Sequence, residues 1–392
     1  MTRTRLLTLL AIPLCSALLL SVRSRPLAAG GPDPGSLPSH ATDIVVVTEA
    51  DSGKQVFAQV GQLIELRLDA NPSTGYMWDL SSLDGTALVV VDRLFQPLSD
   101  RPGAAGTETI RLRALRTAKM HLKLEYHRSW EIGKAPLRIF SLSLLVREGS
   151  GGLTEQVLSM EVTPTVASSL SMRAPQSASQ DSNLPSAFDW RTLGGTTAVK
   201  DQGSWGMCWA FATVGVMESA LKIWAKTETD LSERYLGLHN ESGWSYVEGG
   251  DLAHDYHVFK KPTGEREAGA VLESDCPYTG MPDRCPGASP LRHPYMLDAW
   301  DYLPYDTDAI KQAIYRYGPV TVGVCAFFGM GAYQGGVFET DEGYWCGSAL
   351  TNHVVVLVGW DDSQGSHGVW IMRNSWGVGW GESGYMRIGY GG

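Results

Sequence analysis

The sequence predicts an α+β protein with two domains: an all-β sandwich, followed by a domain with a helical half and a β half. Residues 41–163 contain short apolar runs that alternate with polar residues and are separated by turn residues, a pattern typical of a β-sandwich. An apolar, helix-favouring segment begins at Cys208. From Pro319 onward, alternating apolar runs with glycine turns indicate strands. The order of these patterns places a mixed domain after the sandwich.

The boundaries of the expected elements follow from the apolar pattern. In the first domain we expect strands over Ile44–Thr48, Leu63–Leu68, Leu88–Val91, Thr109–Leu115, His121–Tyr126 and Ile139–Val146. In the second we expect strands over Val320–Val324, His353–Val358, Val369–Arg373 and Tyr385–Ile388. The helix from Cys208 is expected to reach about Thr227. Its buried face should carry Val214, Met217, Leu221 and Trp224, which recur every three or four residues.

Length, charge and the N-terminus limit the possible partners and the compartment. The chain has 392 residues and a formal net charge of -10, which argues against nucleic acid as a main partner. Basic residues followed by the apolar run Leu6–Val22 predict a secretory signal peptide over residues 1–29. The alternative is a membrane anchor, but the run is short and contains Pro13. We expect a monomer that is secreted, either extracellular or periplasmic, without a stable membrane anchor.

The cysteine count agrees with an oxidising compartment. Five cysteines remain after signal cleavage, which suggests two disulfides and one free thiol. The sequence-local pairings are Cys276–Cys285 and Cys325–Cys346, and they leave Cys208 free; other pairings stay open. Between the domains, residues 164–183 are rich in Ser, Ala and Gln and predict a linker, either a passive tether or an activation cleavage site.

Three segments of the second domain carry residues suited to nucleophilic catalysis. Cys208 is expected at a helix N-terminus, where the macrodipole favours a thiolate. Gln202, six positions upstream, offers an amide donor to an oxyanion. His353 begins an apolar strand, where an aliphatic residue would suit a core position. Asn374 can orient an imidazole without removing its proton, and Trp376 would shield that hydrogen bond from water.

These segments resemble the papain-like cysteine peptidases, and the resemblance covers residues 184–392. The start of the domain, LPSAFDWR, is similar to the mature N-terminus of that family. The resemblance implies an endopeptidase acting on peptide or protein substrates through Cys208, His353, Asn374 and Gln202. It also implies that substrates run as an extended strand along Gly249 and Gly250, with Trp376 in the cleft. No cofactor or metal is indicated.

Two departures from the family pattern lead to specific expectations. Trp205 and Val247 stand where the family has a pair of disulfide-bonded cysteines, so we expect the two segments to pack together as an apolar replacement. Met207 precedes the nucleophile, where we expect it to narrow the leaving-group side of the cleft.

Three turn segments of the first domain stand out: NPSTGYMW at 71–78, GAAGTE at 103–108 and RSWE at 128–131. Their order and spacing together resemble the loops of chagasin-like inhibitors of papain-like peptidases. The resemblance covers residues 41–163 and implies an immunoglobulin-like sandwich whose loops enter a papain-like cleft. Serine replaces the family threonine at Ser73 and the family proline at Ser129, and Ala105 replaces a glycine. The residues expected in the three loops are Asn71, Pro72, Ser73, Thr74, Gly75 and Tyr76, then Gly103 and Gly106, then Arg128 and Trp130.

An inhibitor and a peptidase in one chain suggest a latent enzyme. The intramolecular inhibitor domain would hold the cleft until the linker is cleaved. Two alternatives keep the peptidase active: the first domain inhibits foreign peptidases in trans, or it is a targeting module. A further alternative is acyl transfer by the same residues.

Overall fold

The computed structural model describes most of both predicted domains. It describes residues 44–80, 82–148, 184–240, 242–251, 269–280, 283–286, 291–297, 300–346 and 351–391. The expected signal peptide, 1–29, and linker, 164–183, lie outside these ranges. Among the described residues, no helix is both long and apolar enough to cross a membrane. Residues Thr42–Gly392 belong to one compact unit, within which the two domains contact each other.

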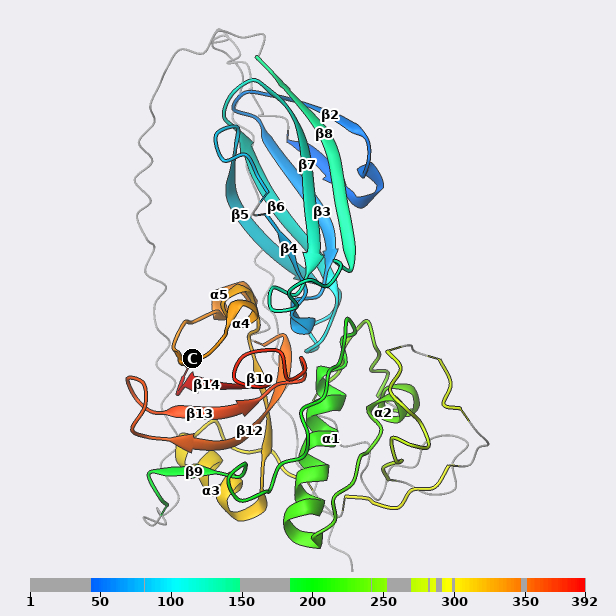
Figure 1. Cartoon of the computed structure of the whole chain (residues 1–392), viewed down its shortest axis with the longest axis vertical. Helices are drawn as coiled ribbons and strands as arrows, with labels where there is room; N and C mark the ends of the chain where they lie inside the picture. The colour runs from blue at the N-terminus through cyan, green and yellow to red at the C-terminus, as the bar shows by residue number, and fades with distance from the viewer. Residues whose placement is uncertain are drawn as a thin grey trace, which may run out of the picture. The chain divides into compact units, whose positions relative to one another are not determined.

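The first domain is a sandwich of two four-stranded sheets, with strand orders β1-β3-β6-β5 and β2-β8-β7-β4 (Figure 1). The strands are β1 (Val45–Thr48), β2 (Gln55–Gln59), β3 (Leu63–Ala70), β4 (Met77–Asp79), β5 (Leu88–Pro97), β6 (Gly106–Ala114), β7 (Ala118–His127) and β8 (Arg138–Arg147). Two short 3-10 helices, η1 (Glu49–Asp51) and η2 (Pro72–Thr74), lie in the connections.

The sandwich has a core made entirely of its own residues. Alternate positions of β3 point inward, so Ile64, Leu66 and Leu68 are fully buried while Arg67 and Asp69 are exposed. The same alternation in the other strands completes the core with Ile110, Leu112, Leu122, Leu124, Phe140, Leu142 and Leu144. The domain therefore meets the basic requirement for independent folding.

Strand register brings the three predicted loops to one end of the sandwich. Ala70, the last residue of β3, pairs with Gly106, the first residue of β6. Met77, the first residue of β4, pairs with His127, the last residue of β7. The turns 71–76, 98–105 and 128–137 follow directly from these strand ends, so they emerge side by side although they are distant in sequence.

The second domain has a helical part and a six-stranded sheet (Figure 1). Its helices are α1 (Cys208–Ala220) with the π-helical turn η3 (Leu221–Ala225), α2 (Glu233–His239), α3 (Thr307–Tyr317), α4 (Phe328–Ala332) and α5 (Gly343–Cys346). The strands are β9 (Ala187–Asp189), β10 (Val320–Val324), β11 (Val337–Phe338), β12 (His353–Asp361), β13 (Val369–Arg373) and β14 (Tyr385–Gly389). The sheet runs β10-β12-β13-β14-β11, and β9 pairs with β12.

Strand β12 is buried on both faces and joins the two parts of this domain. Val354, Val356 and Val358 pack in the cluster that contains α1. Val355 and Leu357 point to the opposite side, into a tryptophan-rich cluster. This two-sided burial explains the unbroken apolar run that follows His353 in the sequence.

One detail of the expected helix is wrong. The helical segment ends at Ala225, and Trp224, which was expected on its buried face, is 61% exposed. Its indole N–H donates to the Tyr317 carbonyl at 2.9 Å. The π-helical turn over Leu221–Ala225 changes the angular period of the last residues, so the three-or-four spacing no longer predicts which side is buried.

Candidate active site

Cys208 is the first residue of α1 and is completely buried. It is the free cysteine among the described residues, because the other four form the disulfides Cys276–Cys285 and Cys325–Cys346. The turn before it is fixed by backbone bonds: the Gly206 N–H donates to the Tyr246 carbonyl, and the Phe211 N–H closes the first turn of the helix on Met207. The thiol is thereby held at the positive end of the helix.

His353 and Asn374 meet at the adjoining ends of β12 and β13. His353 Nε2 lies 2.8 Å from Asn374 Oδ1, which also accepts from the Ser375 N–H. Because Asn374 presents an oxygen, the neutral imidazole carries its proton on Nε2 and leaves Nδ1 with a lone pair. Nδ1 is buried and has no hydrogen-bond partner among the described residues. The Trp376 ring is stacked on the imidazole at 5.1 Å between centroids.

Burial favours the neutral forms of the thiol and the imidazole. It raises the pKa of Cys208 to about 12, although hydrogen bonds from the Val354 and Trp209 backbone and from Ser73 oppose the rise. It lowers the pKa of His353 to about 4, against the opposing effect of its hydrogen bond to Asn374. In this arrangement neither group is ionised near neutral pH.

Gln202 is buried beside these groups, with its side chain anchored at both ends. Its Nε2 donates to the Trp205 carbonyl at 2.8 Å, and its Oε1 accepts from the Ser375 hydroxyl at 2.7 Å. A primary amide has two N–H bonds, so one stays available for a further acceptor. The carbonyl of Gln202 accepts from the Tyr278 hydroxyl.

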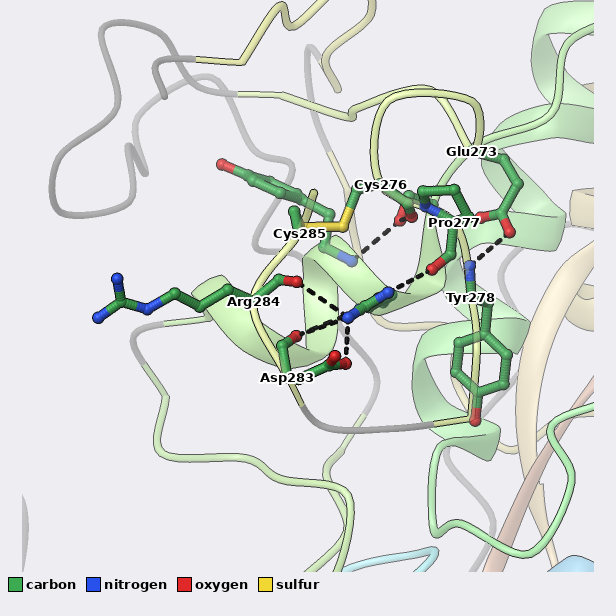
Figure 2. Close-up of a disulfide and its surroundings, with 10 residues drawn as sticks. Glu273, Cys276, Pro277, Tyr278, Asp283, Arg284 and Cys285 are labelled. Atoms are coloured by element: carbon green, nitrogen blue, oxygen red, sulfur yellow. Dashed lines mark hydrogen bonds and ion pairs between the residues drawn. A yellow bond between two sulfur atoms is a disulfide. The ribbon is translucent and has the colours of Figure 1, made fainter. Parts of the chain in front are cut away.

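The Cys276–Cys285 disulfide supports this turn from outside (Figure 2). It closes the loop that carries Tyr278, whose backbone N–H donates to Glu273. The Arg234 guanidinium binds the carbonyl oxygens of the same loop, those of Pro277, Asp283 and Arg284. These contacts position the Tyr278 hydroxyl that donates to the Gln202 carbonyl.

The departures at Trp205 and Met207 have mixed outcomes. Trp205 packs edge-on against Tyr246 at 5.6 Å, and its indole N–H donates to the Gly280 carbonyl, so the two segments do pack together. Val247 itself takes no part, since its side chain is 43% exposed. The expectation for Met207 is wrong: it is fully buried in the apolar cluster around α1, and its methyl group lies against Gly237 in α2.

The second turn of the first domain lies along the expected glycine pair. The Gly250 N–H donates to the Pro102 carbonyl at 3.0 Å, and the Ala105 N–H donates to the Val247 carbonyl at 2.8 Å. A Cβ atom at Gly249 would lie 2.2 Å from the Pro102 carbonyl oxygen. This close approach requires glycine, so Gly249 and Gly250 here pair with a segment of the same chain.

Gly103 lies directly against the thiol. Its N–H donates to the Asn352 carbonyl at 2.7 Å, and its carbonyl accepts from Asn71 Nδ2 at 2.9 Å. A Cβ atom at Gly103 would lie 2.6 Å from the Gly206 carbonyl oxygen and 3.2 Å from Cys208 Sγ. Since φ at this residue is +86°, glycine is favoured for its backbone as well as for its size.

The first turn of the first domain contacts Trp376. Its helix η2 buries Pro72, Ser73 and Thr74. The Trp376 indole N–H donates to the Ser73 carbonyl at 2.9 Å. Gly75 then reverses the chain with φ of +78°, and a Cβ atom there would lie 2.3 Å from the Trp130 ring.

The third turn contributes Arg128 and Trp130. Arg128 is 1% exposed; its Nη1 lies 2.9 Å from Asp201 Oδ1, and its Nη2 donates to the Gly203 carbonyl at 3.0 Å. Its Nε also donates to the Thr74 carbonyl, which joins the first and third turns. The Trp130 ring is stacked on Trp376 at 5.4 Å with an angle of 14°.

Gly106 and Tyr76, both expected in the loops, make their described contacts within the first domain. Gly106 is the first residue of β6, where a Cβ atom would lie 2.1 Å from the Gln96 carbonyl oxygen of the neighbouring strand β5. Its role is therefore to let two strands pair closely. Tyr76 stacks on Tyr126 inside the sandwich and lies beside the Arg128 guanidinium.

The sequence did not reveal a further contact area on α4. The Arg93 guanidinium lies 4.2 Å from the centre of the Phe328 ring, and the Ser129 hydroxyl donates to the Gly331 carbonyl at 3.1 Å. Strand β5 had been predicted, but nothing in one strand indicates its partner in another domain.

Comparison with known proteins identifies both domains. The model for the papain family cysteine protease matches residues 184–392, and the model for the chagasin family peptidase inhibitor I42 matches residues 58–144. The cysteine endopeptidase RepA of Oryza sativa subsp. japonica is 34% identical over 209 residues, which is 53% of each chain. The germination-specific cysteine protease 1 of Arabidopsis thaliana is 34% identical over 207 residues, 52% of each. The chain thus spans about half the length of the curated relatives it matches.

Among solved structures, this chain is similar to that of the bromelain protease from Ananas comosus in complex with the E64 inhibitor. That likeness has 29% identity and a TM-score of 0.45, and it covers 53% of this chain and 91% of that chain.

Proposed function

Since this chain belongs to the papain family of cysteine proteases, we propose that it is a secreted cysteine endopeptidase held latent by its own chagasin-like domain. Peptide bonds are hydrolysed by Cys208, His353 and Asn374 once the linker between the domains is cleaved. The observation that carries the proposal is the position of Gly103, whose backbone lies against Cys208 Sγ and along the wall of the cleft.

The chemistry follows from the arrangement of three side chains. With the first domain removed, water reaches the site, and the pair can ionise by moving the thiol proton to His353 Nδ1. The Cys208 thiolate attacks the peptide carbonyl, and the imidazolium protonates the leaving amine. The second N–H of Gln202 and the first N–H groups of α1 stabilise the oxyanion. Water, activated by His353, then hydrolyses the thioester.

Latency is supported by what the first domain places in the cleft. The Pro102–Ala105 segment makes backbone hydrogen bonds with Val247 and Gly250, as an extended substrate would. Water is excluded from Cys208, and both members of the pair are neutral. Joining the inhibitor to the enzyme also gives an effective concentration on the order of mM, so even a modest intrinsic affinity keeps the site closed.

Two observations support the proposal that the protein is secreted. The N-terminal sequence has a signal-peptide pattern, and the described part of the chain contains two disulfides beside a free buried thiol. A reducing cytosol would not maintain both disulfides.

The decisive experiment compares two glycine substitutions in the full chain. Gly103→Ala places a methyl group against Gly206 and Cys208, whereas Gly61→Ala imposes a similar backbone strain, φ +85°, with no atom within 4 Å. Both variants are assayed under reducing conditions for hydrolysis of a fluorogenic peptide and for alkylation of Cys208 by iodoacetamide. We expect at least about tenfold faster rates for Gly103→Ala, equivalent to about 1.4 kcal/mol, and no change for Gly61→Ala.

The outcomes separate activity from latency. A Gly103→Ala chain that is readily alkylated but hydrolyses no peptide would exclude the peptidase activity. Equal hydrolysis by the unmodified chain and both variants would exclude latency, and Cys208→Ala provides the blank. Release of the first domain is tested by substituting a protease recognition site into residues 164–183. After this linker is cut, activity should rise on dilution, because the first domain is no longer held at a high effective concentration.

A further inference from the structure

Arg128 of the first domain marks an acidic site on the second domain. Its guanidinium binds both oxygens of Asp201, at 2.9 and 3.0 Å, and the Gly203 carbonyl at 3.0 Å. Arg128 is 1% exposed, so its charge has been taken out of water and is compensated here. The partners include Glu131 of the same turn, whose carboxylate lies 3.4 Å from Nη1.

The two acceptors belong to the peptidase domain and are fixed there. The Gly203 N–H donates to Asp201 Oδ1 at 2.8 Å, which orients the carboxylate within its own turn. Asp201 also forms a backbone bridge with Trp376. Neither interaction involves the first domain, so the carboxylate and the carbonyl stay in position when Arg128 leaves.

The location of this site assigns it to one half of the cleft. The Pro102–Ala105 segment runs along Gly249 and Gly250, the wall where the family resemblance places an extended substrate. Asp201 lies at the other wall, where its backbone pairs with that of Trp376, whose ring is stacked on His353. His353 delivers its proton to the leaving amine, so a site beyond it meets the leaving-group side of the substrate.

We propose that Asp201 and the Gly203 carbonyl form a subsite for a basic side chain, arginine above all, on the leaving-group side of the scissile bond. Arg128 occupies this subsite in the latent chain. Arginine is preferred to lysine because its planar fork can contact both acceptors together. The inference rests on the proposed peptidase activity and specifies the substrates of that activity.

The test uses the full chain opened by Gly75→Val and Gly103→Val, two positions in the first domain where a side chain would clash with the contacts described above. Quenched fluorescent peptides carry arginine, or its neutral isostere citrulline, at successive positions after the scissile bond. The ratio of kcat/KM for the two peptides is measured with Asp201 and with Asp201→Asn. The exposed Asp301→Asn provides a control with the same change in net charge.

We expect arginine to be preferred by about tenfold at one position, as for a charge-assisted hydrogen bond, and the preference to vanish in Asp201→Asn alone. A merely structural role for Asp201 would lower both rates together and leave their ratio unchanged, which would overturn the subsite. Equal hydrolysis of both peptides by the Asp201 chain would overturn it as well. If the opened chain hydrolyses none of the peptides, the proposed peptidase activity and this inference fail together.

Discussion

The two walls of the closed cleft are held by different kinds of contact. At the main-chain wall, formed by Val247, Gly249 and Gly250, the second domain contributes backbone N–H and carbonyl groups. The first domain meets them with its own backbone, and the side chains of Ser99 and Arg101 donate to the neighbouring Glu248 and Gly243 carbonyls. At the side-chain wall, formed by Asp201 and Trp376, it is bound through the guanidinium of Arg128 and the ring of Trp130. The second domain therefore presents backbone groups at one wall, and a carboxylate and an aromatic ring at the other.

This difference separates general inhibition from selectivity. Backbone pairing requires little more than glycine and an extended segment, so it suits any cleft that binds peptides as strands. An ion pair and an aromatic stack require particular partners, and interfaces concentrate their binding energy in such Trp and Arg residues. The contact of Arg93 with Phe328 adds to the second category. Substitutions at the side-chain wall should thus affect closure far more than truncations at the main-chain wall.

The largest effect is expected from Trp130→Ala. Trp130 packs in the tryptophan-rich cluster of the peptidase domain rather than in the core of the sandwich, so its loss should open the cleft without unfolding the first domain. Truncating a central aromatic anchor costs about 2 kcal/mol or more, which corresponds to roughly thirtyfold faster alkylation of Cys208. The measurement is the iodoacetamide rate in the full chain at neutral pH.

Ile132→Ala provides the matched control, because it lies in the same turn and its side chain is 94% exposed. Its alkylation rate should equal that of the unmodified chain. If Trp130→Ala also left the rate unchanged, the side-chain wall would not contribute to closure.

The next effect is the pH dependence of closure. The pKa of Cys208 is raised to about 12 in the closed form, so the closed site keeps the thiol proton over the whole ordinary pH range. In the open form the ionised pair holds the same proton on His353. No net proton is exchanged until the open imidazolium loses its proton. Above that pH, closing the cleft takes up a proton. The equilibrium constant for closure therefore falls by about tenfold per pH unit, until the pH approaches the raised pKa of the thiol.

This linkage is measured as the alkylation rate of the full chain relative to that of the opened Gly75→Val, Gly103→Val chain. The ratio should be flat near neutral pH and should rise on the alkaline side. The pKa of His353 shifts in the opposite direction, down to about 4 in the closed form. Above that pH the closed imidazole takes up no proton, so its protonation does not strengthen closure. A ratio that stayed flat to high pH would mean that the closed site does not retain the thiol proton.

Much of this arrangement could be predicted from the sequence, because the signals are local. The apolar runs gave the long strands, and Val320–Val324 and Val369–Arg373 have the predicted bounds. Strands β2 and β4 were missed because they are short and lie at the edges of their sheet. The expected residues of the site meet where the topology brings strand ends together, as with His353 and Asn374.

What could not be predicted depends on contacts between distant segments. Gly106 was predicted in a loop, but glycine is required there because the neighbouring strand β5 leaves no room for a side chain. Met207 precedes the thiol in sequence, yet its side chain packs in the core against Gly237 of α2. The partners of Arg128 and Arg93 belong to another domain, and neither spacing nor composition identifies a partner across the chain.

The smallest effect, and the sharpest test of the main-chain wall, is expected from Val247→Ala. Val247 contributes its carbonyl oxygen to the bond from the Ala105 N–H, while its side chain is 43% exposed and outside the apolar clusters. Removing two methyl groups there should change closure by no more than about 0.5 kcal/mol, or roughly twofold in the alkylation rate. The comparison is made with Gly103→Ala at the same pH. If Val247→Ala opened the site as much as that variant does, side-chain packing would have to hold both walls, and the contrast between them would disappear.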